Sequence, residues 1–142
     1  MALRSAWLLV GSLVVGTASA QPFDLGDLSG EELFGRFCAA CHGSQARGDG
    51  PVARSLSTAV PDLTRIEERN GGEFPADAVR QSIDGRSLAV AHGTRAMPVW
   101  GYEFWIEEGA DITAERDARG IIRRLVEYLA DIQGNAQGDA RR

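Results

Sequence analysis

The chain has 142 residues, with fifteen basic side chains, all arginine, against twenty acidic ones, for a formal net charge of −5 at pH 7. This charge argues against nucleic-acid binding, because contact with a phosphate backbone needs a surplus of basic groups. The length allows one domain of ordinary size.

The first twenty residues have the pattern of a secretory signal peptide. A basic start with Arg4 precedes an apolar stretch over residues 6–15, and Ala18-Ser-Ala20 offers small residues for cleavage. The stretch is too short to cross ~30 Å of hydrocarbon, and no later segment reaches ~18 consecutive apolar residues. We therefore expect an exported, periplasmic protein without a membrane span; an uncleaved anchor is the alternative. Cleavage leaves 122 residues, with fourteen basic and twenty acidic, a net charge of −6.

Helical signals follow along the mature chain. Ser29 and Glu32 have the spacing of a capping box, which predicts a helix over residues 30–40 with an apolar stripe. Gly, Ser and Ala then dominate residues 43–61, which indicates a loop with one short helical turn.

The second half of the chain adds three helical signals. Residues 75–85 predict a helix of about ten residues with proline at its start and glycine after its end. Residues 100–108 are aromatic and compatible with a short helix. The clearest helix begins near residues 111–113 and closes at Gly134. No run alternates as a strand would, so the fold class is all-α. The chain thus divides into a signal peptide (1–20), one domain (21–134) and a disordered tail (135–142).

One short motif carries the chemistry. Cys38-Ala-Ala-Cys41-His42 has the pattern of c-type haem attachment. Residues three and four apart share a helix face, so both sulfurs and the imidazole can meet one planar group. We expect Cys38 and Cys41 to form thioethers with a single haem c, and His42 to bind its iron.

Two other uses of a closely spaced cysteine pair are a redox-active dithiol and a structural zinc site. A thioredoxin-like redox pair would follow a strand, and none is predicted before Cys38. A structural zinc site needs four ligands, whereas the mature chain has two cysteines and two histidines in all.

The second axial ligand has two candidates. Met97 is the only methionine left after cleavage, and Pro98 stiffens the loop that would present its sulfur. His92 is the alternative, which would give bis-histidine ligation.

These features resemble the class I cytochrome c family. Gly30 and Phe34 stand eight and four residues before the first cysteine, where the family has a small residue and an aromatic. Leu125 and Tyr128 match its C-terminal helix, and Met97-Pro-Val-Trp-Gly101 resembles its methionine loop. The resemblance implies a cytochrome c fold of three to five helices around one covalently attached haem, with crossing N- and C-terminal helices.

The resemblance also implies that a proline carbonyl after the motif accepts the proton of the proximal imidazole, and Pro51 is the candidate. Four side chains could donate to the haem propionates: Arg86, Arg95, Trp100 and Trp105. For each of the four, an ordinary place on the surface or in the core is the alternative.

Two strong axial ligands leave no open position on iron, so we expect a one-electron carrier between redox proteins, monomeric and not an enzyme. A haem enzyme or gas-binding protein would require Met97 to be off the iron. A subunit docked permanently on an oxidoreductase is a third reading. The mature charge of −6 and the absence of lysine favour a basic or mainly apolar partner surface.

Overall fold

The computed structural model describes residues 24–87 and 97–134, and every regular element in these two ranges is helical, which confirms the all-α fold class. The α-helices are α1 (Gly30–Phe37), α2 (Ala39–His42), α3 (Ile66–Arg69), α4 (Ala76–Asp84), α5 (Trp100–Glu107) and α6 (Ile112–Asp131); the 3₁₀ helices are η1 (Leu25–Asp27), η2 (Ala53–Ser55) and η3 (Leu63–Arg65). Among the described residues, no helix is long and apolar enough to cross a membrane.

The predicted capping box begins α1. The Ser29 hydroxyl accepts from the Glu32 amide at 3.2 Å, and the Glu32 carboxylate accepts from the Ser29 amide at 2.8 Å. The helix expected over residues 30–40 is interrupted at Cys38, whose φ of −114° is wider than a helix allows. The chain turns once more as α2, so the two cysteines and the histidine lie on one short helical turn.

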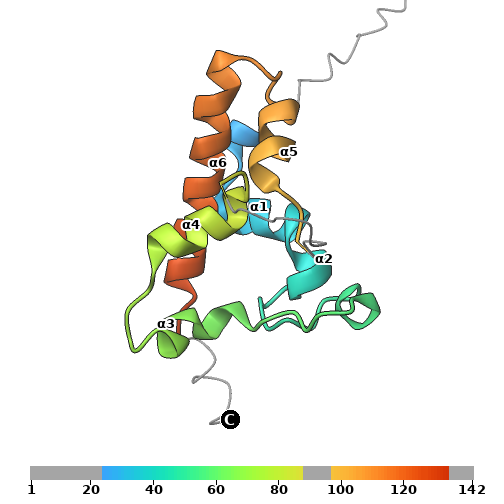
Figure 1. The fold of residues 1–142 in the computed structure, drawn as a ribbon, viewed down its shortest axis with the longest axis vertical. Coiled ribbons are helices and arrows are strands. Elements are labelled where there is room, and N and C mark those ends of the chain that lie inside the picture. The colour runs from blue at the N-terminus through green and yellow to red at the C-terminus, as the bar shows by residue number, and fades with distance from the viewer. Residues whose placement is uncertain (1–23, 88–96, 135–142) are drawn as a thin grey trace, which may run out of the picture.

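Helix α6 is the central helix of the fold, and α1 crosses it (Figure 1). Asp111 caps α6 by accepting from the amides of Thr113 and Ala114 at 2.7 and 2.9 Å. The Phe34 and Tyr128 rings meet at 5.3 Å where the two helices cross. The crossing of the N- and C-terminal helices is therefore confirmed.

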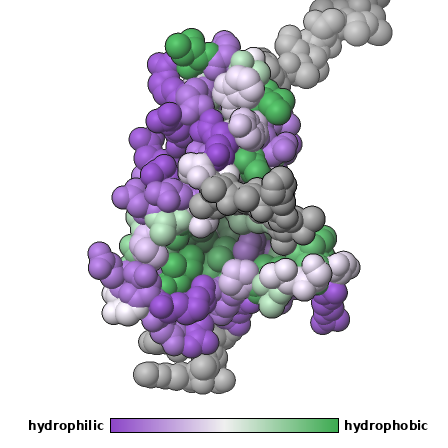
Figure 2. All heavy atoms as spheres, in the orientation of Figure 1, coloured by the Kyte–Doolittle hydropathy of each residue, from purple (hydrophilic) through white to green (hydrophobic). Residues whose placement is uncertain are grey.

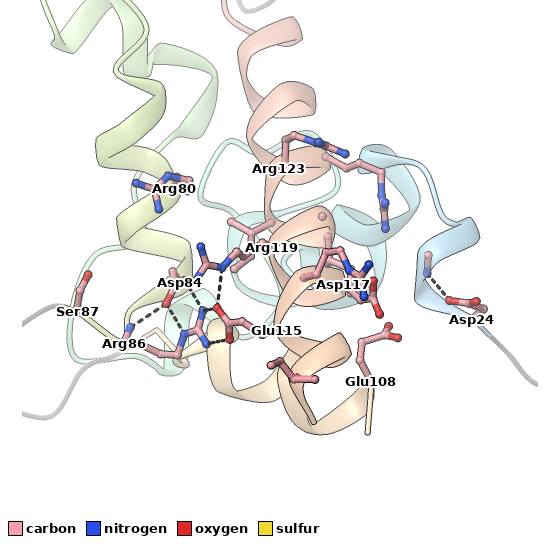
Figure 3. Close-up of a pocket in the computed structure, with 17 residues that line it drawn as sticks. Asp24, Arg80, Asp84, Arg86, Ser87, Glu108, Glu115, Asp117, Arg119 and Arg123 are labelled. Atoms are coloured by element: carbon pink, nitrogen blue, oxygen red, sulfur yellow. Dashed lines mark hydrogen bonds and ion pairs between the residues drawn. The ribbon is translucent and has the colours of Figure 1, made fainter. Parts of the chain in front are cut away.

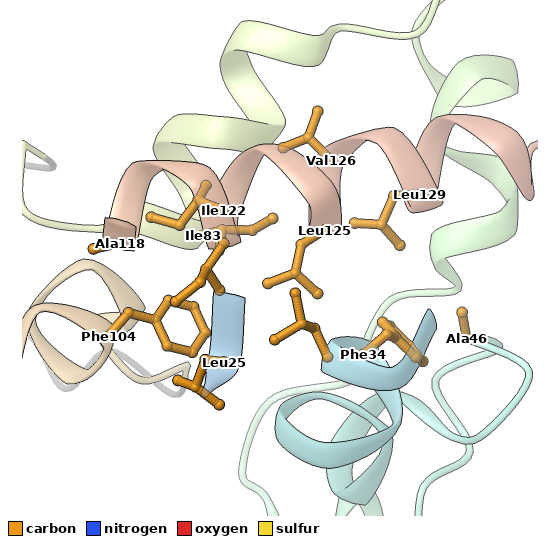
Figure 4. Close-up of a cluster of buried hydrophobic side chains, with 12 residues drawn as sticks. Leu25, Phe34, Ala46, Ile83, Phe104, Ala118, Ile122, Leu125, Val126 and Leu129 are labelled. Atoms are coloured by element: carbon orange, nitrogen blue, oxygen red, sulfur yellow. The ribbon is translucent and has the colours of Figure 1, made fainter. Parts of the chain in front are cut away.

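The core lies along the inner face of α6 (Figure 4). Its largest fully buried side chains come from three helices: Leu33, Phe34, Phe104, Ile121, Ile122 and Leu125. The aromatic segment 100–108 does form a helix, α5, and Trp100 stacks on Phe104 with ring centroids 5.5 Å apart. Packing of these rings against α6 explains why a segment without clear periodicity is helical.

Three local features differ from the sequence expectation. Pro75 precedes α4 as its N-cap instead of occupying the first helical position. The lead-in contains η1, where Leu25 is buried and its carbonyl accepts from Arg124 at 3.0 Å. The segment containing η3 and α3 was not predicted, because turns this short carry no hydrophobic period. The signal peptide predicted over residues 1–20 and the tail predicted over residues 135–142 lie outside the described residues.

Candidate functional site

An apolar cavity of about 450 Å³ opens on the face between α2, α4 and the start of α5. Figure 2 shows the hydrophobic hollow in the middle of this face. Four residues that sequence analysis singled out line it together: Cys38, Cys41, His42 and Met97. Its volume lies in the range of ~300–1,000 Å³ typical of ligand and cofactor sites.

The loop after the cysteine motif folds back onto α2. The amides of Gly50 and Val52 donate to the carbonyls of Cys41 and Ala40 at 3.2 and 3.0 Å. A β-carbon on Gly50 would lie 2.6 Å from the Cys41 carbonyl carbon, so no larger residue fits there. The end of the loop beyond this turn, residues 56–61, forms one wall of the cavity beside the histidine.

The end of that loop contacts His42 through Pro61. Burial lowers the pKa of His42, and the Pro61 carbonyl, acting as a hydrogen-bond acceptor, partly opposes this. The Nδ1 atom of His42 is buried and has no hydrogen-bond partner among the described residues. The Pro61 carbonyl lies near the ring but does not complete a hydrogen bond to Nδ1. The resemblance pointed to Pro51, whereas the carbonyl that lies against the imidazole belongs to Pro61, ten residues further along. A neutral imidazole whose Nδ1 faces a carbonyl keeps Nε2 for a metal.

Both cysteines are partly buried. Burial, and to a smaller extent the neighbouring Cys41, raises the pKa of the Cys38 thiol to about 12. A thioredoxin-like pair needs a lowered thiol pKa, so this shift has the wrong direction for that chemistry. Within residues 24–87 and 97–134, no group of three or more His, Cys, Asp or Glu side chains could hold a metal ion.

Met97 reaches the cavity from the segment that leads into α5. It is partly buried and packs against the core cluster, as does Trp100 three residues later. Trp100 is held by edge contact with Phe37 at 5.6 Å, which ties the start of α5 to α1. His92, the alternative ligand, lies outside the described residues, as does Arg95.

A family model described as "Cytochrome C oxidase, cbb3-type, subunit III" matches residues 27–114, more than half of the chain, including the cysteine motif and Met97. The chain belongs to this family of c-type cytochromes. No curated protein and no solved structure gave a match. Membership implies covalently bound haem c and a part in electron transfer, and class I character is consistent with the fold.

The cavity of this c-type cytochrome fits the prosthetic group. Its lining is almost wholly apolar, and the donor set of two thiols, one neutral imidazole and one thioether suits haem attachment and iron ligation. A second, wider groove of about 1570 Å³ lies between α4 and α6, but charged side chains line it and none of the four candidates does (Figure 3). The apolar cavity is therefore the candidate haem site.

The structure of the cytochrome shows which of the described candidates for binding propionates lie at the cavity. Trp100 lines the cavity. The Trp105 indole instead donates to the Asp111 carbonyl at 3.0 Å, and the Arg86 guanidinium is occupied by Asp84 and Glu115 outside the cavity. The sequence did not predict that the 56–66 segment would line the cavity with apolar side chains, since contact between this segment and the site depends on how the loop folds.

Proposed function

We propose that this chain is an exported monohaem c-type cytochrome that carries single electrons between redox proteins and has no enzymatic activity. The observation that carries the proposal is that Cys38, Cys41, His42 and Met97 line one apolar cavity. One attachment motif and one such cavity among the described residues support a single haem.

Each of these residues has a role in the proposal. Cys38 and Cys41 would hold the porphyrin through thioethers, and His42 and Met97 would take the two axial positions. A bound haem supplies an iron that alternates between ferric and ferrous states and so gains or loses one electron. Two protein ligands leave no position for a substrate. The apolar walls exclude water, and methionine ligation raises the reduction potential.

Electrons would leave beside the attachment cysteines, where α2 and the loop behind it reach the surface. Val52, next to this edge, is a large hydrophobic residue with 41% of its surface exposed. A transient partner would bury a small interface, below ~1,200 Å², because turnover requires release.

A second candidate function is that of an electron-transferring subunit held permanently on a larger oxidase. It is favoured by the name of the matching family, which describes a subunit of a cbb3-type cytochrome c oxidase. The two functions share the haem site and differ in whether the chain is free.

Mass and redox measurements on the protein from its native source test the proposal. The intact mass is expected to equal residues 21–142 plus one haem, and a redox titration should fit one electron. Two free thiols, or haem removed by acid butanone, would contradict covalent attachment. Ready binding of carbon monoxide with turnover of a small molecule would instead indicate a haem enzyme.

The free-carrier reading is tested by the oligomeric state. Light scattering on the periplasmic fraction should give the mass of a monomer. Recovery of the haem protein only with a membrane oxidase would favour the subunit reading.

A further inference from the structure

A cluster of charged side chains joins three helices outside the haem cavity. Helix α4 ends at Asp84, and Gly85, with φ of 72°, reverses the chain. The reversal brings Arg86 back onto Asp84, to whose carboxylate its Nε and Nη2 donate at 2.8 and 2.9 Å.

The same guanidinium reaches across to α6. Arg86 donates to both carboxylate oxygens of Glu115, in the first turn of α6, at 2.6 and 3.2 Å (Figure 3). The Arg86 and Asp84 side chains are only 21% and 16% exposed. Hydrogen bonds from Arg86 lower the pKa of both carboxylates. A two-sided fork of charge-assisted bonds that is partly shielded from water has a defined geometry.

Helix α5 begins against this cluster. A β-carbon on Gly101, the second residue of α5, would lie 2.5 Å from both Arg86 Nε and Asp84 Oδ1. Gly101 is buried and stands four residues after Met97. The cluster therefore touches the chain on both sides of the connection that carries Met97, at the end of α4 and at the start of α5.

We propose that Arg86, with Asp84 and Glu115, is a positioning residue for Met97. By holding the start of α5 against α4 and α6, the cluster keeps the methionine where its sulfur can stay on the iron. The inference rests on the proposed function, in which Met97 is the second axial ligand. Arg86 itself does not line the haem cavity, so it acts through the backbone of α5.

The test uses the haem-loaded protein and a matched pair of variants. Arg86→Gln removes the fork that joins the three helices. Arg119→Gln is the control, because it removes another arginine bound to the same Glu115, at 2.7 Å, but one that is 73% exposed and lies on α6 alone. Both changes remove one positive charge.

The near-infrared charge-transfer band of the methionine–iron bond and the far-ultraviolet helix signal are followed through one urea titration. In Arg86→Gln the band should disappear at a lower urea concentration than the helix signal, with a wider gap than in wild type or Arg119→Gln. Arg86→Lys, which keeps the charge but not the planar fork, should restore only part of the difference.

Gly101→Ala gives a second, independent variant, which matters if Arg86→Gln folds poorly. Its β-carbon pushes on the intact cluster and should cause the same early loss of the band. If band and helix signal fall together in both variants, the cluster is merely stabilising and the inference is overturned. If wild type shows the band and neither variant alters it, the inference is overturned but Met97 ligation stands. If wild type shows no band, Met97 ligation is overturned as well.

Discussion

Gly30 of α1 lies so close to Tyr128 of α6 that a β-carbon on the glycine would stand 2.7 Å from the tyrosine β-carbon. It would also collide with the Arg124 carbonyl oxygen. Gly30→Ala should therefore force the two helices apart and destabilise the protein by about 1–3 kcal/mol in urea unfolding.

Gly35 provides the control for this substitution on the same helix. A β-carbon there meets nothing within 4 Å, so Gly35→Ala should leave stability unchanged or raise it by up to ~1 kcal/mol through helix propensity. Equal effects of the two changes would mean that the crossing is not as tight as the structure indicates.

Phe34 fills the centre of the same crossing and is 1% exposed. Phe34→Ala should lower the free energy of unfolding by roughly 3–5 kcal/mol, because it leaves a cavity between α1 and α6. Ile112→Ala, at a position 89% exposed, should change it by less than ~0.5 kcal/mol. A loss below about 1 kcal/mol for Phe34→Ala would contradict the packed crossing.

Met97→Ala should abolish the near-infrared methionine–iron band of the ferric protein and lower its reduction potential, because the thioether ligand raises that potential. His92→Ala should leave both unchanged. The reverse pattern, with no band in wild type and an effect of His92→Ala alone, would indicate bis-histidine ligation.

The carboxylates of Asp84 and Glu115 make stability depend on pH. Arg86 lowers both pKa values, with Arg119 adding to the effect at Glu115 and Arg80 to that at Asp84. A carboxyl whose pKa is lowered by folding binds fewer protons in the folded state. Its contribution to the free energy of unfolding is therefore present above the unfolded pKa values of 3.8 and 4.5, and it is lost as the pH falls through the folded pKa values.

Urea unfolding between about pH 6 and about pH 3 measures this linkage. Wild type should lose stability steadily toward acid, and Arg86→Gln should flatten the slope. An unchanged slope in the variant would show that other carboxylates dominate the acid response.

The stretch of sequence that contains Cys38 and Cys41 differs in charge from the whole chain. Residues 33–61 carry three arginines and one aspartate, a local charge of +2. Oxidation of the reduced protein by hexacyanoferrate(III), an anion that accepts one electron to become hexacyanoferrate(II), should therefore slow as salt rises.

Two charge reversals locate the effect. Arg54→Glu, on the loop behind the cysteines, should slow the reaction and weaken its salt dependence. Arg116→Glu makes the same change of charge on α6 and should do little. A wild-type rate that rises with salt would mean that the overall acidic charge governs the encounter.

Much of the fold follows from signals that are local in the sequence. The Ser29–Glu32 capping box, the Asp111 cap and the apolar stripe of α6 act within one or two helical turns, so neighbouring residues are sufficient to reveal them. Interruption of the first helix at Cys38 was not predicted, since a single wide φ leaves no trace in residue type.

The sequence by itself determined the chemistry of the candidate haem site, because the spacing of Cys38, Cys41 and His42 is a property of one helical turn. Which proline faces His42 was decided by the tertiary structure, since the glycine turn that folds the loop onto α2 brings Pro61 there in place of Pro51. The pairing of Arg86 with Glu115 was decided in the same way. These partners lie 29 residues apart, and only the packing of α4 and α5 against α6 brings such distant groups to the same place.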